Sequence, residues 1–309
     1  MGTGRDHDSG HGHGHVPPGR GGRLALVLGL TCVVLVVEVV GAVVTGSLAL
    51  LADAGHMLTD VFGLTLAVVA SVLVRRPVTD QRTRGFRRAE VLAAAAQAAV
   101  LLAVGMFVIV EGVRRLLAPP EVAPGAMLVF GAVGLVANLV GVGILLGSRR
   151  ADLNLRAAFL EVVNDALGSV AVLVAAAVIA TTGWLRADAV ASLVIGVLIM
   201  PRTLRLLRES VDVLLESTPR GLDLAGVREH LMALPHVHDV HDLHASQVAT
   251  GLPVLTAHVV VDDSCFHDGH VASLLDDLQR CLAADFEVEH STFQLEARSH
   301  AAHEHPTHP

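Results

Sequence analysis

The stretch LLADAGHMLTDVFG, residues 50–63, places three ionisable side chains inside an otherwise apolar run. Asp53, His56 and Asp60 are spaced three and four residues apart, which brings them to one face of an α-helix. Ionisable groups inside a bilayer cost about 2.5–3.5 kcal/mol each on insertion scales, and they usually mark a pathway or a binding site. The stretch therefore predicts a membrane helix that contributes to a transport pathway or a binding site.

The rest of the chain fits a membrane protein. Of its 309 residues, 52% are hydrophobic, and several segments reach the roughly 20 apolar residues that a spanning helix needs. The polar start leads into a full-length apolar span, so no cleaved signal peptide is expected. Six spans are predicted, at residues 24–45, 48–74, 89–115, 124–147, 157–183 and 187–207.

Arginines are distributed unequally between the two ends of the predicted spans. One side carries the larger number, at residues 75, 76, 82, 84, 87, 88, 149, 150, 156, 202, 205 and 208, and the other has only residues 114, 115 and 186. Positively charged connections stay in the cytoplasm. We therefore expect an integral protein of a bacterial plasma membrane with both termini in the cytoplasm and a membrane domain over residues 24–208.

Residues 209–298 have the pattern of a small cytosolic domain. A helix is predicted at 223–233, strands at 237–248 and 254–261 around a turn that contains Gly251, a second helix at 268–284 and a last strand at 287–296. This αββαβ order is typical of a ferredoxin-like α+β domain. The fold class expected is thus a six-helix membrane protein followed by a ferredoxin-like domain.

Charge and cysteine content exclude some functions. Residues 209–309 hold seventeen Asp or Glu and four Arg, whereas the whole chain carries a net charge of −8 and no Lys. So acidic a domain argues against nucleic acid as a partner. The three cysteines form no CxxC pair, so no disulfide framework is expected.

Both ends of the chain are rich in histidine. The N-terminal tail, residues 1–23, which we expect to be disordered, and the C-terminal tail, residues 299–309, each contain four closely spaced histidines. Segments so poor in apolar residues cannot bury a core. Two interpretations remain open for both tails: they bind metal loosely, or they are flexible ends without a ligand.

A second polar stretch, AAFLEVVNDALGSV at residues 157–170, matches the first. Glu161 and Asp165 lie four residues apart, as do His56 and Asp60, so two facing helices can offer one imidazole and three carboxylates to a divalent cation. The alternative is that these groups only hydrogen-bond between helices. Other polar residues of the spans are expected to pack or to support the site, namely Glu38, Gln97, Glu111 and Asn138.

The segments SLALLADAGHMLTD, GFRRAEVLAA, AAFLEVVNDALGS and VHDLHASQ together resemble the cation diffusion facilitator family, in order, over residues 20–297. The resemblance implies efflux of zinc, cadmium or cobalt from the cytoplasm by proton antiport, in a homodimer without an organic cofactor. It maps the transport site onto His56, Asp60, Glu161 and Asp165. Zinc-type members usually have His at the position of Glu161, which leaves the preferred metal open.

The resemblance also implies metal binding in the cytosolic domain. His241, His258 and His290, with His270 as a further candidate, match the metal positions of relatives. Such a site would draw two acidic domains of a dimer together and give the metal a regulatory role. The alternative is that these histidines only belong to a solvated acidic surface.

Two other functions are alternatives to an antiporter. An intramembrane metallohydrolase needs a general base beside an open metal position, and the chain has neither HExxH nor GxSxG. A membrane-anchored metal sensor would bind the metal without moving it. The buried ligands and the resemblance favour a secondary transporter rather than an enzyme.

Overall fold

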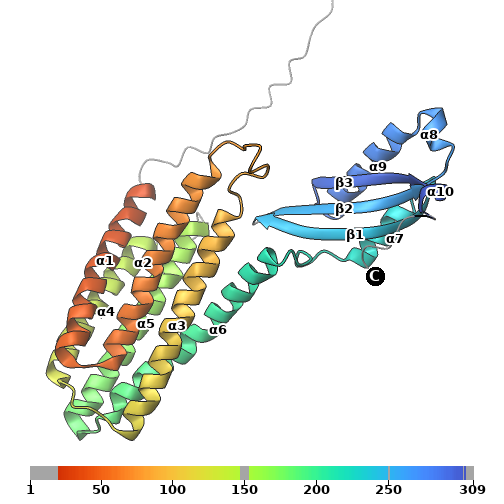
Figure 1. The fold of residues 1–309 in the computed structure, drawn as a ribbon. Helices are drawn as coiled ribbons and strands as arrows, with labels where there is room; N and C mark the ends of the chain where they lie inside the picture. Colours follow the sequence, from red (N-terminus) through yellow and green to blue (C-terminus); the bar gives the residue numbers. More distant parts are fainter. Residues whose placement is uncertain (1–19, 147–152, 250, 302, 304–309) are drawn as a thin grey trace, which may run out of the picture. The chain divides into compact units, whose positions relative to one another are not determined.

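The computed structural model describes residues 20–146, 153–249, 251–301 and residue 303. Six of its helices are long and apolar enough to cross a membrane (Figure 1). They are α1 (Arg20–Thr45), α2 (Leu48–Val74), α3 (Ala89–Leu117), α4 (Pro124–Leu146), α5 (Leu153–Thr182) and α6 (Arg186–Leu214). The expected six-span membrane domain is confirmed as a fold class.

The surfaces of these helices are apolar, as helices in lipid require. Val43 is 79% exposed and Leu198 is 71% exposed, and side chains of this kind face hydrocarbon in a membrane protein. α6 also continues past residue 208, where we expected the membrane domain to end, although Pro201 lies within it. The arginines after Pro201 end the apolar span without breaking the helix, because Arg is a good helix former.

Internal contacts divide the chain into two compact units, the first within Met1–Val61 and Ala103–Ile199, the second within Phe62–Leu102 and Met200–Pro309. In the first unit α4 packs closely against α5 and α1. Glycines make this possible: a Cβ added at Gly141 would lie 3.0 Å from Cγ1 of Val162 on α5. Small residues let membrane helices approach each other in this way.

The second unit contains the C-terminal α+β domain, whose expected αββαβ order is confirmed. Its elements are α7 (Leu224–Met232), β1 (Val237–Ala249), β2 (Leu252–Val261), α8 (Cys265–Asp268), α9 (Val271–Asp285), β3 (His290–Ala297) and α10 (Arg298–Ala301). The sheet order is β1-β2-β3; β1 and β2 are antiparallel, and β2 and β3 are parallel. The short helices α8 and α10 are additions to the expected pattern.

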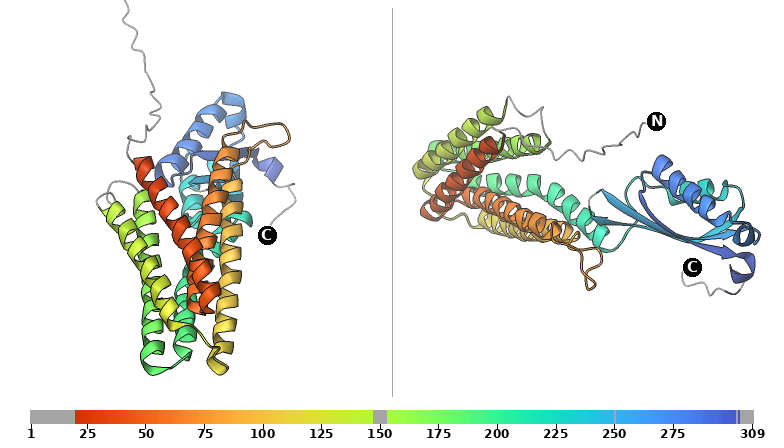
Figure 2. Two further views of the ribbon diagram at one scale, coloured as in Figure 1. Left: turned by 90° about the vertical axis from the view of Figure 1, so that its left-hand side faces the viewer. Right: turned by 90° about the horizontal axis from the view of Figure 1, so that it is seen from above.

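One hydrophobic core holds this domain together. Leu274, Leu278 and Leu282 of α9 lie three or four residues apart, so they share one face of that helix. They pack with Val227 and Leu231 of α7 against apolar side chains of the sheet. Figure 2 shows α9 running along one face of the sheet.

Some features expected from the sequence lie outside the described residues. These are most of the N-terminal tail (residues 1–19), the arginines at positions 149 and 150, and His305 and His308 of the C-terminal tail.

Candidate metal sites

α2 and α5 bring the four expected ligands of the membrane site together. Nε2 of His56 lies 3.3 Å from Oδ2 of Asp60 and 3.6 Å from Oε1 of Glu161. Ligand atoms of His56, Asp60 and Asp165 all lie within 4.8 Å of one another. α2 and α5 thus each contribute two side chains, one helical turn apart, to the same region between the two helices.

These four side chains differ in their access to the outside of the protein. His56 and Asp165 are 8% and 3% exposed, whereas the side chains of Asp60 and Glu161 are 24% and 25% exposed. Three carboxylates this close repel one another unless a cation or protons offset their charge. The ligand atoms of His56, Asp60 and Asp165 supply one nitrogen and two oxygens, and the Glu161 carboxylate beside His56 would complete the four donors that suit a tetrahedral divalent cation.

Two further carboxylates, Glu38 of α1 and Asp53 of α2, lie buried near the four ligands. They are 1% and 2% exposed and interact with each other. Glycines leave room for them: a Cβ at Gly134 of α4 would lie 2.8 Å from Oε1 of Glu38, and one at Gly168 of α5 would collide with Oδ1 of Asp53. Asp53 therefore adjoins the site without joining the group of possible metal ligands.

In the C-terminal domain, β1 and β2 place His241 directly opposite His258. Nε2 of His241 lies 3.3 Å from Oε2 of Glu296, and Nδ1 of His258 lies 2.8 Å from Oε1 of the same carboxylate. Glu296 is only 2% exposed, and buried carboxylates are normally paired, as this one is with the two imidazoles. Two imidazoles around a buried carboxylate form a second group able to bind a metal ion.

Sequence reasoning missed Glu296 and placed His290 with this cluster. His290 starts β3 and pairs with Val254, whereas Glu296 lies near the other end and pairs with Val260. Six residues of strand separate them by about 20 Å. The signal for Glu296 was available in the sequence: a lone carboxylate in FQLEA, on a strand that borders the strand of His258.

His236, His238 and His270 lie apart from this cluster, whereas His244 adjoins it, since its Nε2 lies 2.8 Å from Oδ1 of Asp242 and Oδ2 of Asp242 lies 3.7 Å from Nε2 of His258. Nδ1 of His236 is 3.0 Å from Oδ2 of Asp262, and Nε2 of His238 is 2.5 Å from Oδ1. The hydrogen bonds from His238 and His236 lower the pKa of Asp262. His270 contacts Asp268 at 2.8 Å. These exposed pairs are typical of a solvated acidic surface.

Two family models match the chain. The cation efflux transmembrane domain matches residues 24–215, and the cytoplasmic domain of cation efflux proteins matches residues 219–298. Together they span the six membrane helices and the α+β domain.

Curated relatives match over nearly the full length. The metal cation efflux system protein CzcD of Cupriavidus metallidurans is 40% identical over 96% of this chain and 90% of its own. The zinc transporter ZitB of Escherichia coli is 39% identical over 94% and 92%. The cadmium, cobalt and zinc/H(+)-K(+) antiporter of Bacillus subtilis is 34% identical over 86% of both chains.

A solved structure, the metal-bound C-terminal domain of CzcD from Cupriavidus metallidurans, is 37% identical, with a TM-score of 0.22; it covers 24% of this chain and 99% of that domain. The family models and the curated relatives together cover both parts of the fold. The chain belongs to the cation efflux, or cation diffusion facilitator, family of transporters.

Proposed function

We propose that this transporter exports zinc, and also cadmium or cobalt, from the cytoplasm in exchange for protons through His56, Asp60, Glu161 and Asp165. One observation carries the proposal: ligand atoms of His56, Asp60 and Asp165 from two membrane helices lie within 4.8 Å of one another. The names of the relatives support the choice of metals and the antiport. The metal is the cargo of this site.

Proton exchange follows from the chemistry of these ligands. An imidazole binds a metal only when its ligating nitrogen is unprotonated, and carboxylates bind best when ionised. Metal binding therefore releases protons, and protons entering from the other side displace the metal. His56 suits this exchange because imidazole changes its charge near neutral pH.

Glu161 bears on the choice of metal. One nitrogen and three oxygens form a harder ligand set than the two nitrogens and two oxygens of a site with two histidines. Such a set accepts manganese and iron more readily, while zinc still binds because its affinity ordinarily exceeds theirs. We infer a broader metal range than that of a site with two histidines.

The orientation and assembly are also part of the proposal. Both termini lie in the cytoplasm of a bacterial cell, and two chains form a homodimer. The match of residues 219–298 to a cytoplasmic domain and the arginine distribution support this orientation. Bacterial relatives support the plasma membrane as its location.

The cytosolic cluster gives the metal a second role. We infer that His241, His258 and Glu296 bind a zinc ion that regulates transport, because the buried carboxylate faces two imidazoles. Asp242 extends the cluster, with Oδ2 3.7 Å from Nε2 of His258. His290 enters this proposal through the family resemblance alone.

The first prediction concerns the membrane ligands. Asp60→Ala and Asp165→Ala should each lower zinc uptake into proteoliposomes by at least about tenfold, because loss of a ligand charge weakens metal binding. Asp212→Asn, an exposed carboxylate on α6, is the matched control and should retain parental uptake. Parental uptake by both ligand variants would remove the case for this site.

The second prediction concerns coupling. Zinc uptake into proteoliposomes with an acidic lumen should proceed as protons leave, and it should collapse when an ionophore dissipates the pH gradient. Asp60→Ala vesicles should hold the same gradient and take up no zinc, which separates coupled transport from leakage. Zinc uptake indifferent to the gradient would contradict antiport with protons.

The third prediction concerns Glu161. Glu161→His should raise the ratio of zinc to manganese uptake, by about tenfold, because an imidazole replaces a hard oxygen donor. Glu161→Asp keeps the carboxylate and serves as the control. If competition assays give superimposable selectivity for Glu161→His and the parent, Glu161 does not bind the metal.

The fourth prediction concerns the cytosolic cluster. His258→Ala and Glu296→Gln should each reduce the number of zinc ions bound per purified chain and alter the zinc dependence of transport, with the membrane ligands intact. His290→Ala, tested in parallel, decides whether His290 belongs with the cluster. Unchanged zinc content in both His258→Ala and Glu296→Gln would exclude the cytosolic site.

A further inference from the structure

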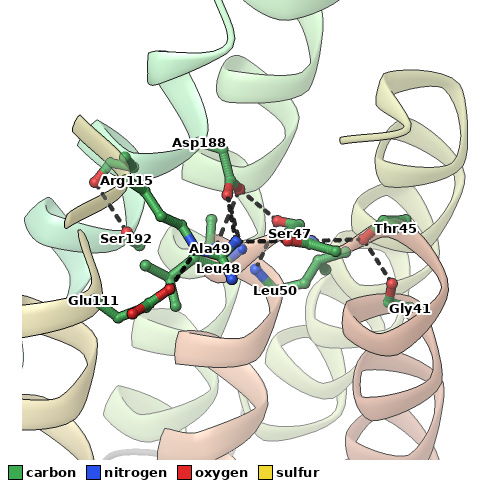
Figure 3. Close-up of polar contacts among 12 residues, drawn as sticks. Gly41, Thr45, Ser47, Leu48, Ala49, Leu50, Glu111, Arg115, Asp188 and Ser192 are labelled. Carbon is green, nitrogen blue, oxygen red and sulfur yellow. Dashed lines mark hydrogen bonds and ion pairs between the residues drawn. The ribbon is translucent and has the colours of Figure 1, made fainter. Parts of the chain in front are cut away.

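The first turn of α2 is capped by a side chain from another helix. Asp188 of α6 accepts hydrogen bonds from the backbone N–H groups of Leu48, at 2.7 Å, and Ala49, at 3.2 Å. It also accepts one from the hydroxyl of Ser47, at 2.5 Å (Figure 3). A helix normally receives such a cap from its own preceding residue.

Ser47 completes the cap. Its hydroxyl accepts a hydrogen bond from the N–H of Leu50 at 3.2 Å, and its carbonyl accepts one from Leu51 at 3.3 Å. The first four N–H groups of a helix have no partner within the helix. In α2 those of Leu48, Ala49 and Leu50 bind Asp188 and the Ser47 hydroxyl, and that of Ser47 donates to the Thr45 hydroxyl at 3.2 Å. A buried N–H group without a partner is destabilising, so this end of α2 depends on Asp188.

Charge strengthens this contact between Asp188 of α6 and the first turn of α2. Asp188 is 2% exposed, and its carboxylate lies at the positive end of the α2 dipole. Nη1 of Arg115, on α3, lies 3.9 Å from Oδ2 of Asp188 and donates to the carbonyl of Gly46 at 2.6 Å. Glu111 in turn accepts a hydrogen bond from Nε of Arg115 at 3.1 Å.

The cap links α2 to α6, the helix that follows α5 in the chain, and α2 and α5 carry the proposed transport ligands. α5 ends at Thr182 and α6 begins at Arg186, so Asp188 lies just after α5 in the chain. Ala49 and Leu50 of α2 share a hydrophobic core with Ala176 and Ile179 of α5. The cap therefore holds the start of α2 beside the end of α5.

We infer that Asp188 is a positioning residue for metal transport: by capping α2, it sets the height and rotation of His56 and Asp60 against Glu161 and Asp165. His56 lies about 12 Å along the helix from Leu48, at 1.5 Å per residue. A helix with satisfied backbone hydrogen bonds transmits a shift at its start to these side chains. The inference rests on the proposed transport site.

The test separates positioning from simple stabilisation of α2. Asp188→Ala removes the link from α6, and Ser47→Asp in the same chain supplies a carboxylate cap from α2 itself. Asp188→Ala should raise the zinc concentration for half-maximal uptake by about five- to tenfold and lower the melting temperature. The added Ser47→Asp should restore the melting temperature while half-maximal uptake stays shifted, because the link to α6 is still missing.

The control lies at the same end of the membrane helices. Thr182→Val removes the hydrogen bond from the backbone of Trp184 to the Thr182 hydroxyl without touching α2, and it should leave half-maximal uptake at the parental value. Zinc uptake into proteoliposomes and thermal unfolding in detergent give the two measurements for each variant.

Each result bears on one claim. Parental half-maximal uptake in Asp188→Ala, or its full restoration by Ser47→Asp, would overturn the positioning role and leave Asp188 a stabilising cap. Full zinc uptake by Asp60→Ala would instead overturn the proposed transport site. The two failures are therefore distinguishable.

Discussion

Mutual repulsion of buried carboxylates is the constraint on which the membrane domain depends. Asp60, Glu161 and Asp165 surround His56 among apolar helices, where ionised groups are costly unless they are offset. A divalent cation offsets that charge, and so do protons taken up in its place. The same group of carboxylates thus favours binding of a divalent cation and lets protons compete with that cation for the same oxygens.

The buried polar residues of the membrane helices differ in how readily their roles can be predicted from the sequence. α2 and α5 were predictable, because i, i+4 pairs of ionisable groups stand out against apolar runs. Asp188 was missed, since a single carboxylate early in a span looks like a charge at the membrane surface. Its partners are backbone N–H groups of a helix 140 residues away. Every residue type except Pro has a backbone N–H group, so the sequence does not indicate such a contact.

In the cytosolic domain, too, the sequence predicts the elements but not the contacts between residues far apart in the chain. Helix start signals, β-rich runs and the turn at Gly251 predicted its elements to within a few residues. The histidines were too numerous for composition to choose among them. Only strand register selects a group: His241 opposite His258, with Glu296 on the neighbouring strand and His290 at the far end. Pairing partners of strands are set by the whole sheet, which explains why they were not predicted.

The glycines of α4 show how a helix without proposed metal ligands can still affect the proposed cargo site. Gly141 meets Val162 of α5 at a distance that leaves no room for a methyl group without displacement, and Val162 directly follows Glu161. A larger residue at this position would require the Val162 side chain to move, next to the proposed ligand Glu161. The geometry of the proposed metal site therefore also depends on packing against α4, a helix that contributes none of its proposed ligands.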